Sequence, residues 1–377
     1  AATHAGTYAV NAVGTPVVKD AAGNDVSDQF SVDVTPGTLE ITKRNVVLSS
    51  ADASGVYDGN ALTSPDVSIG GDGFVEGEGA DFENTTSRTI IGSVINAFTY
   101  ALNEDTLASD YEITTSFGTL TITGRPDDAK YEISVKAVSG EYLYDGEEHS
   151  AAGFVDPSGG DNIASGEAIT YRINGNEYSV TGLKASVTKK DAGEYTVHVT
   201  GTPVVQDSEG NDVSDQFVVT MTSGTLSIGR RSVILTSGSS TGEYDGSALT
   251  NNEVAVTGDG FAEGEGATYT VTGSQTLVGV SENSFTYLLD EGTRAGNYNI
   301  TVVPGSLTVT NRDAKYSITM EANSGSYKYD GGEKTVEGFK EDTFVIDGKT
   351  YTVSGLTAEA AATHAGTYAV NAVGTPV

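Results

Sequence analysis

Cysteine, basic side chains and long apolar runs are all scarce or missing in this 377-residue sequence. The absence of cysteine excludes a disulfide framework, a thiolate nucleophile and a Cys-ligated metal. No apolar run reaches the roughly 18 residues of a membrane-spanning helix, so we expect any secretion signal or anchor outside these residues. Because extracellular proteins often use disulfides, their absence favours a bacterial surface setting with other means of stabilisation.

The charge balance excludes two classes of partner. The chain carries 52 acidic and 20 basic residues, a formal net charge of −32. A nucleic-acid-binding surface needs the opposite sign, and an anionic membrane would repel this one. We therefore expect no nucleic-acid partner and no direct membrane insertion. Charge of this size mainly keeps an extended chain soluble and self-repelling.

Catalytic patterns are also missing. None of the four histidines is spaced from a serine or a carboxylate as in a known catalytic motif; they are His4, His149, His198 and His364. The sequence has no G-x-S-x-G, H-E-x-x-H or P-loop pattern. We therefore expect no enzyme activity, no catalytic residues and no cofactor.

The most prominent positive feature is a short phrase in which a glycine is followed by alternating polar and apolar residues. It occurs at 37–42, 118–123, 224–229 and 305–310. The alternation predicts a strand with Leu and Ile or Val on one face. Basic residues follow almost at once: Lys43, Arg44, Arg125, Arg230, Arg231 and Arg312.

A second phrase, Tyr-Asp-Gly, alternates with the first. It occurs as Tyr57-Asp58-Gly59, Tyr144-Asp145-Gly146, Tyr244-Asp245-Gly246 and Tyr329-Asp330-Gly331. The structural interpretation is a turn in which Gly supplies a positive φ, Asp bonds local backbone and Tyr packs over the sheet edge. The alternative is a ligand site repeated for avidity.

The two phrases divide the chain into modules of two kinds. We predict first-kind modules at 43–123 and 230–310, of 81 residues each, and a second-kind module at 124–229. Residues 1–42 are then the C-terminal part of a second-kind module, and 311–377 the N-terminal part of another. Residues 1–17 recur unchanged as 361–377, so the period is 360 residues. We expect this sequence to be a window on a longer repetitive protein.

Each module is predicted to be all-β. About seven short strands with frequent turns are typical of an Ig-like β-sandwich, and the array would form an elongated rod. Residues 191–197 have the form of a tyrosine corner, which 4–8 repeat loosely. Asn174-Gly175 and Asp347-Gly348 predict type I′ hairpin turns in the second-kind modules. The alternative, a β-grasp-like module, needs a helix, and only 357–362 offers one helical turn.

Two sets of polar residues are candidate sites. Acidic turns with oxygen ligands near a glycine are a weak calcium candidate, at Asp20, Asn24, Asp25, Asp28, Asp207, Asn211, Asp212 and Asp215. The competing interpretation is that these residues simply make the turn. Lys130 and Lys315 open equivalent strands and are candidates for an amide cross-link to an Asn or Asp.

The basic residues after each closing strand suggest a role at the junctions between modules. We expect them to pair with acidic loops, such as Glu76 and Glu78 or Glu263 and Glu265, and to help fix the angle between modules. Exposed ion pairs contribute about 0–1 kcal/mol each, so they would bias orientation more than stability. A basic surface linker is the alternative.

The order of motifs along the chain resembles the YDG and MBG tandem repeats of large bacterial surface proteins. The motifs that carry the resemblance are Tyr-Asp-Gly, residues 283–287, residues 294–300 and the closing phrase. The resemblance implies secreted, adhesin-like, cell-wall-associated proteins, many from Gram-positive bacteria, whose repeats form stalks. It brings no catalytic residues. The partners expected are neighbouring modules of the same chain. Two alternatives remain open: the repeats bind a host or matrix glycan or protein, or they self-assemble into an extracellular filament.

Overall fold

The computed structural model describes all residues 1–377, and the fold is all-β. Its helices are 3₁₀ turns of three residues each: Ser27–Gln29, Ala108–Asp110, Asp127–Ala129, Ser214–Gln216 and Ala295–Asn297. The helix of a β-grasp module is therefore absent. The expected helical turn at 357–362 is wrong, because these residues belong to strand β33 (Leu356–Ala362). No helix is long and apolar enough to cross a membrane.

The chain divides into two compact units. Unit 1 comprises residues 1–140, 150–188 and 195–226, and unit 2 comprises 141–149, 189–194 and 227–377. Every sheet draws its strands from only one of the predicted modules.

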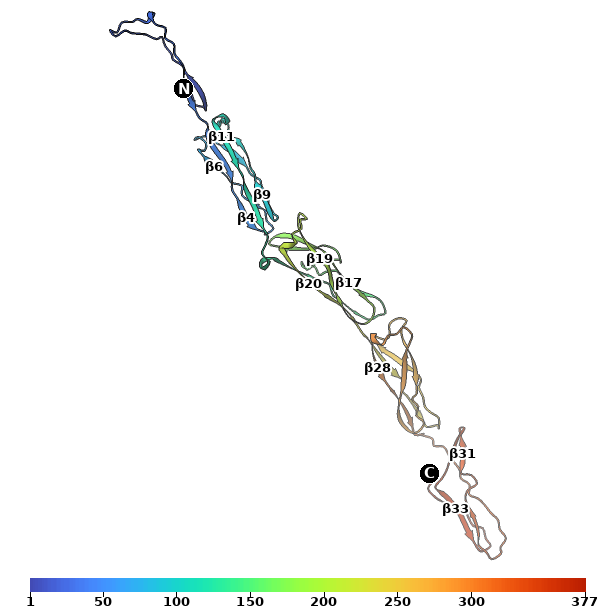
Figure 1. The fold of residues 1–377 in the computed structure, drawn as a ribbon. Coiled ribbons are helices and arrows are strands. Elements are labelled where there is room, and N and C mark those ends of the chain that lie inside the picture. Colours follow the sequence, from blue (N-terminus) through green and yellow to red (C-terminus); the bar gives the residue numbers. More distant parts are fainter. The chain divides into compact units, whose positions relative to one another are not determined.

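The first-kind module at 43–123 has two three-stranded sheets, in the orders β11-β3-β6 and β4-β12-β9, and the pairs β7-β10 and β5-β8. The bounds are β3 (Arg44–Ser50), β4 (Ala53–Val56), β5 (Leu62–Thr63), β6 (Val67–Gly71), β7 (Ala80–Glu83), β8 (Ser87–Arg88), β9 (Gly92–Asn96), β10 (Thr99–Leu102), β11 (Tyr111–Ser116) and β12 (Gly118–Thr123). In Figure 1, β6 and β11 are labelled nearer one end of this module and β4 and β9 nearer the other. Val46, Leu48, Phe98 and Tyr111 form a small core. The modules are thus small and compatible with Ig-like β-sandwiches.

Two chain segments run through both sheets. β3 pairs in parallel with β11, and the following strands β4 and β12 also pair in parallel. Both segments therefore change sheets at the same level, after Ser50 and after Ser116. A Cβ atom on Gly118 would collide there with the backbone of Ala51. Only glycine fits, which explains the residue that begins the closing phrase.

A buried asparagine holds this crossing together. Asn96 is fully buried, and its Nδ2 donates to the carbonyl oxygens of Ala51 at 3.0 Å and Ser64 at 2.9 Å. The Ser50 hydroxyl donates to the Asn96 carbonyl at 2.5 Å and accepts from the Gly118 N–H at 3.0 Å. Because buried polar groups are costly when unpaired, this network fixes where the strands cross.

The first-kind module at 230–310 repeats this architecture, with sheets β24-β22-β28, β23-β29-β26 and β25-β27. The bounds are β22 (Arg231–Ser237), β23 (Ser240–Glu243), β24 (Val254–Gly258), β25 (Ala267–Val271), β26 (Gly279–Asn283), β27 (Phe285–Leu289), β28 (Tyr298–Val303) and β29 (Gly305–Thr310). One difference stands out. The Asn84 amide donates to Asn96 Oδ1 at 3.0 Å, whereas the buried Oδ1 of Asn283 has no partner.

The second-kind module at 124–229 has sheets β13-β20, β14-β21-β18 and β15-β17-β16, with β19 paired to β17. The bounds are β13 (Tyr131–Lys136), β14 (Gly140–Leu143), β15 (His149–Ala152), β16 (Ile169–Ile173), β17 (Asn176–Lys189), β18 (Gly193–Val197), β19 (Val199–Asp207), β20 (Phe217–Thr222) and β21 (Gly224–Gly229). The predicted I′ turn is confirmed, since Asn174 and Gly175 both have positive φ. Asp347 and Gly348 do the same in the later copy.

The end pieces hold fewer strands. Residues 1–42 contain β1 (Gly6–Val10) and β2 (Gly37–Ile41), an antiparallel pair. Residues 311–377 contain the sheets β30-β33-β34 and β31-β32. Their remaining bounds are β30 (Lys334–Glu337), β31 (Thr343–Ile346), β32 (Lys349–Thr352) and β34 (Asn371–Gly374). The Tyr8 hydroxyl donates to the His4 carbonyl at 2.8 Å, which is the bond of a tyrosine corner.

Candidate functional site at the module junctions

All four Tyr-Asp-Gly phrases form the same turn. The glycine φ angles are 84°, 89°, 77° and 81° at Gly59, Gly146, Gly246 and Gly331. The aspartate Oδ1 of each accepts the N–H two residues later, at 2.8, 2.9, 2.7 and 3.0 Å. The predicted roles of Gly and Asp are confirmed. The expected role of Tyr was incomplete, because it reaches the following module.

Tyr57 shows this contact in unit 1. Its side chain is 1% exposed, and its hydroxyl lies 3.5 Å from that of Tyr178, on β17 of the next module. A Cβ atom on Gly59 would collide with the Tyr178 hydroxyl, so this glycine also makes room for the next module. Burial is the main cause that raises the pKa of the Tyr57 hydroxyl, which therefore stays neutral.

Tyr144 occupies the same position at a junction in unit 2 but meets a different partner. It is also 1% exposed, and its hydroxyl donates to Glu265 of the following module. Its ring lies edge-on to Tyr298, with centroids 5.6 Å apart. The Tyr298 hydroxyl donates to the same carboxylate at 2.8 Å. Burial raises the pKa of Tyr298 to about 12 and that of Tyr144 further, so both hydroxyls remain donors at neutral pH.

The last two copies of the phrase separate the turn from the contact. Tyr244 is half-buried, and the Gly246 turn lies against the Tyr351 hydroxyl of the following piece, as Gly59 lies against Tyr178. Tyr329 has no following module within the 377 residues and is 64% exposed. The turn forms in every copy, whereas burial of the tyrosine accompanies a contact with the next module.

An arginine anchors three of these four turns. The Nη1 group donates to the carbonyl oxygen of the phrase's tyrosine, from Arg125 to Tyr57 at 3.0 Å, from Arg231 to Tyr144 at 3.3 Å and from Arg312 to Tyr244 at 3.1 Å. The same guanidinium also contacts the module to which the arginine itself belongs. Arg125 and Arg312 stack 4.0 and 4.1 Å from the ring centroids of Tyr131 and Tyr316, a cation–π geometry. Arg231 instead donates to the carbonyl of Gly260 at 2.9 Å and to that of Asp259.

The contacts at these junctions differ from the expected ion pairs. Arg44 and Arg231 donate to main-chain carbonyls of the 72–73 and 259–260 turns, because the planar guanidinium fits two such acceptors at once. Glu78 and Glu265 accept tyrosine hydroxyls instead. Glu76 and Glu263, like Lys43 and Arg230 beside the anchoring arginines, are exposed.

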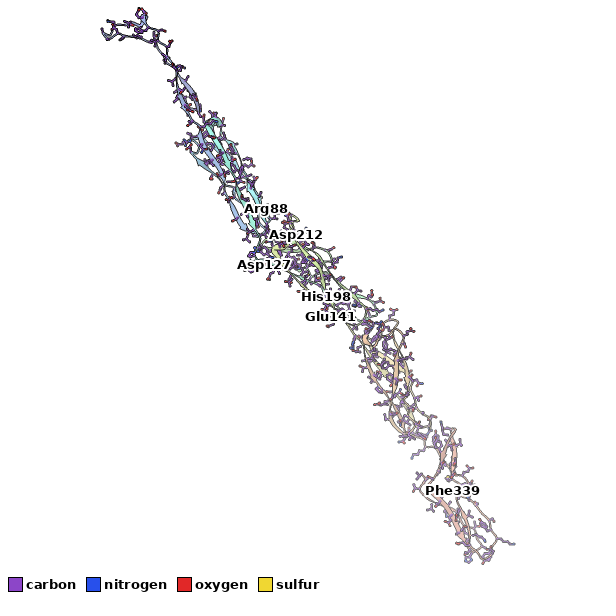
Figure 2. All side chains as sticks on the ribbon, viewed as in Figure 1. Arg88, Asp127, Glu141, His198, Asp212 and Phe339 are labelled. Carbon is purple, nitrogen blue, oxygen red and sulfur yellow. The ribbon has the colours of Figure 1, made fainter.

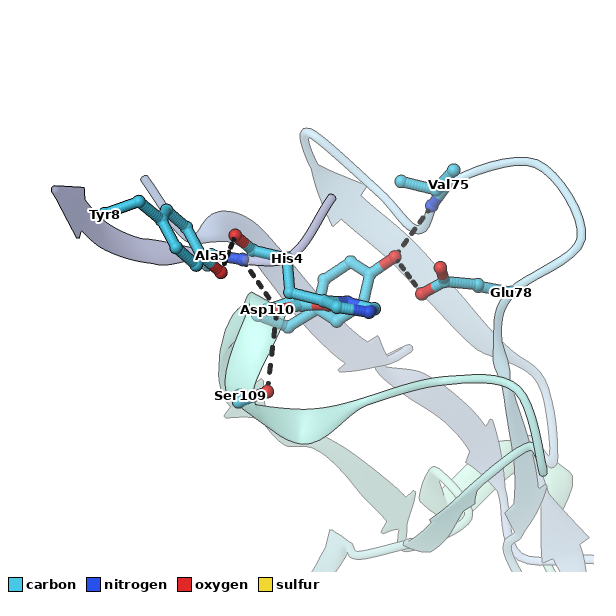
Figure 3. A network of polar contacts seen from close by, with 8 residues as sticks. His4, Ala5, Tyr8, Val75, Glu78, Ser109 and Asp110 are labelled. Atoms are coloured by element: carbon cyan, nitrogen blue, oxygen red, sulfur yellow. Dashed lines mark hydrogen bonds and ion pairs between the residues drawn. The ribbon is translucent and has the colours of Figure 1, made fainter. Parts of the chain in front are cut away.

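A second polar contact joins second-kind to first-kind modules (Figure 3). The Ala5 N–H donates to Asp110 Oδ1 at 2.8 Å, and His4 Nδ1 lies 2.8 Å from Asp110 Oδ2. The hydrogen bond to His4 is the main cause that lowers the pKa of Asp110. In unit 2 the equivalent N–H of Ala192 donates to Asn297 Oδ1, also at 2.8 Å.

The structure does not gather the calcium candidates into a site. The carboxylates of Asp20 and Asp207 accept hydrogen bonds from backbone N–H groups and from the side-chain amide of Asn24 or Asn211 in the same turn. The carboxylates of Asp25 and Asp212 accept hydrogen bonds from the hydroxyls of Ser27 and Ser214, respectively. Asp28 and Asp215 belong to the 3₁₀ turns that follow. No group of three or more His, Cys, Asp or Glu residues is placed to hold a metal. Turn formation accounts for Asp20, Asn24 and Asp25 and for their counterparts Asp207, Asn211 and Asp212.

The lysine candidates are not placed against a cross-strand partner. Lys130 lies 2.9 Å from Asp127, only three residues away, and Lys315 is exposed. Figure 2 labels Asp127 near Arg88 and Asp212, on the part of unit 1 where the 43–123 and 124–229 modules meet. The structure therefore gives the half-buried Lys130 an ion pair with the exposed Asp127 at a junction.

The receiving residues Tyr178 and Tyr351 were not predicted from the sequence. Both stand three residues after the hairpin glycine, at Gly175 and Gly348, and this common spacing was the available signal.

Comparisons with known proteins add little to this geometry. No family model matches the chain, and no curated protein matches it. Among solved structures, it is similar to the crystal structure of the N-terminal four Ig domains of Dscam1 isoform 8.4. The match has 11% identity and a TM-score of 0.12, over 74% of this chain and 76% of that one.

Proposed function

We propose that this chain is a structural repeat region of a bacterial cell-surface, adhesin-like protein, in which Ig-like modules form a stalk that projects a distal binding region. The observation that supports it best is the arginine anchor, which occurs at three successive junctions with the same acceptor, the carbonyl of the Tyr-Asp-Gly tyrosine. Flexible linkers need no such contact. A stalk needs it at every step, because one free joint would let the distal region fold back.

The contacts at each junction are suited to resist bending. A buried aromatic side chain contributes about 3–5 kcal/mol relative to alanine, and a hydrogen bond from a charged donor about 1.5–3 kcal/mol. These contacts exceed what an exposed ion pair provides. With a net charge of −32, the modules also repel each other at longer range.

Neighbouring arginines provide a matched test. Arg231 anchors Tyr144, whereas Arg230 is exposed. Arg231→Glu should broaden the distribution of shapes in small-angle scattering and reduce the maximum dimension, while Arg230→Glu makes the same charge change and should leave both unchanged. Equal scattering from the two variants would contradict the proposed stalk mechanism.

A further inference from the structure

We propose that each first-kind module is a clamp that withstands tension along the chain, because its entering and leaving segments are paired so that pulling slides one past the other. The proposal rests on the stalk function, since a stalk is pulled whenever its distal region is held. In the 43–123 module the entering segment is β3 and β4, and the leaving segment is β11 and β12. This module lies wholly in unit 1 and the 230–310 module wholly in unit 2, so each clamp is complete within one unit.

The two segments run parallel along their whole length. Residues 44–49 lie opposite 111–116, and residues 53–56 lie opposite 120–123. The chain enters the module at the first of these pairs and leaves it at the last, so entry and exit are at opposite ends of one ladder. Tension along the chain therefore pulls the two segments in opposite directions along the strands. The evenly spaced hydrogen bonds of a parallel ladder share this load, whereas an antiparallel terminal pair would open one bond after another.

Each pulled strand is also central in its sheet. The orders β11-β3-β6 and β4-β12-β9 place the entering strand β3 and the leaving strand β12 each between two neighbours. Sliding either strand therefore breaks two ladders rather than one. Val46 and Leu48 on β3, and Leu120 and Ile122 on β12, are at most 4% exposed. Sliding would move these side chains out of the positions that bury them, which costs further free energy.

Side chains bridge the place where the strand ladder is interrupted. Strand pairing stops at the level where both segments change sheets. There the Gly118 N–H donates to the Ser50 hydroxyl at 3.0 Å. The Thr119 N–H donates to Asp52 Oδ1 at 2.7 Å. Side-chain oxygens of the entering segment thus replace backbone acceptors at the crossing, and the two segments remain hydrogen-bonded through it.

The bridge to the second residue of the closing phrase recurs in the other complete modules. In the 230–310 module, where β22 and β23 pair in parallel with β28 and β29, the Ser306 N–H donates to the Ser239 hydroxyl at 2.9 Å. In the second-kind module the Thr225 N–H donates to the Ser139 hydroxyl at 3.0 Å. Ser239 and Ser139 thus take the place of Asp52. What recurs is an acceptor oxygen rather than one residue type, which is the mark of a hydrogen-bonding role.

The test pulls the same clamp in two directions in the full chain, which has no cysteine of its own. Lys43→Cys with Thr123→Cys places the tethers at entry and exit, so force slides the segments. Lys43→Cys with Ser109→Cys places both tethers at one end of the ladder, so force peels the segments apart. All three positions are exposed. Because forced unfolding is governed by the unfolding barrier, we expect an optical trap to measure a sliding force several times the peeling force. Equal forces would overturn the proposal.

Three substitutions made in both tethered forms separate the bridge from general stability. Asp52→Ala removes the acceptor of the Thr119 N–H, so it should lower the sliding force. The peeling force should stay unchanged, because peeling is limited by the bonds at the end where it starts. Asp52→Ser introduces the residue type of the other first-kind module and should keep the sliding force. Asp66→Ala removes another exposed carboxylate and should change neither force.

The outcomes of this set are distinct from those of the stalk test. A fall in both forces with Asp52→Ala, or in neither, would contradict the role of the bridge in the clamp. Scattering from the Arg231→Glu variant reports bending at a junction, whereas the tethers load the inside of one module. The clamp can therefore fail while the stalk proposal stands, and the stalk proposal can fail while the clamp stands.

Discussion

Replacing Tyr144 by alanine should loosen both modules that meet at its side chain. Tyr144 is 1% exposed and touches Glu265 and Tyr298 of the following module. Deleting a buried aromatic ring costs about 3–5 kcal/mol. Tyr329 occupies the same position of the same turn but is 64% exposed. Tyr329→Ala should therefore change stability by no more than about 0.5 kcal/mol.

Hydrogen exchange followed by mass spectrometry is the suitable assay, because a chain of several modules does not unfold in one transition. Amides that open locally exchange faster by a factor of ten for each 1.4 kcal/mol lost. For Tyr144→Ala we expect amides in residues 141–149 to exchange at least about a hundredfold faster. Residues 258–266, which belong to the following module, should accelerate as well.

The response of the following module is what refutes or supports the reasoning. If Tyr144 served only its own turn, residues 141–149 would exchange faster while 258–266 kept their original rate. That result would contradict the assignment of this tyrosine to the junction. The conservative variant Tyr144→Phe keeps the ring and removes the hydrogen bond to Glu265, so its effect should be smaller, about 1–2 kcal/mol.

Three further predictions concern the crossing and the polar contacts. Val271 occupies the position of Asn84, so Val271→Asn should give Asn283 Oδ1 a donor and stabilise the 230–310 module by about 1 kcal/mol. The reverse change, Asn84→Val, should destabilise the 43–123 module by about 1–3 kcal/mol. Unchanged calorimetric transitions in these variants would contradict this prediction. Gly118→Ala should destabilise its module by about 1–3 kcal/mol. Gly55→Ala should not, because there is open space around Gly55. Equal denaturant midpoints for the two variants would refute the close approach between Gly118 and the Ala51 backbone. The pKa of Asp110 is lowered in the folded chain, so its contact with His4 stabilises the fold at pH values above the ordinary pKa of 3.8, and this stabilisation is lost as the pH falls below that value. Protection of the Ala5 amide from hydrogen exchange should therefore drop at low pH in the native chain. In Asp110→Asn the protection should not depend on pH.

The sequence allowed the backbone conformation of the junction turns to be predicted. The conformation of a turn is determined by its own residues. Gly59 therefore has the predicted positive φ, and Asp58 accepts the predicted backbone hydrogen bond. The I′ turn at Asn174 follows from the same kind of local rule. Alternation of side chains likewise predicted β12, whose Leu120 and Ile122 are buried.

The partners across the junction could not be predicted, for two physical reasons. Tyr57 and Tyr178 are 121 residues apart, and no local pattern specifies a contact at that distance. The acceptors of Arg231 are main-chain carbonyls, which every residue carries, so they have no sequence signature. With 52 acidic residues in the chain, an ion pair was the natural expectation for any arginine, but carbonyls in a turn offered a better geometry.

The polar contact between second-kind and first-kind modules has its acidic side chain on opposite sides in its two copies. At one junction the second-kind piece supplies His4 and the first-kind module supplies Asp110. At the other, the second-kind module supplies Asp191, 2.6 Å from Arg294 of the first-kind module. The shared N–H contact, from Ala5 or Ala192, fixes the same geometry in both. Exchanging the two second-kind modules would therefore place Asp191 against Asp110, and like charges in contact oppose association. This like-charge contact would distinguish one order of the second-kind modules from another.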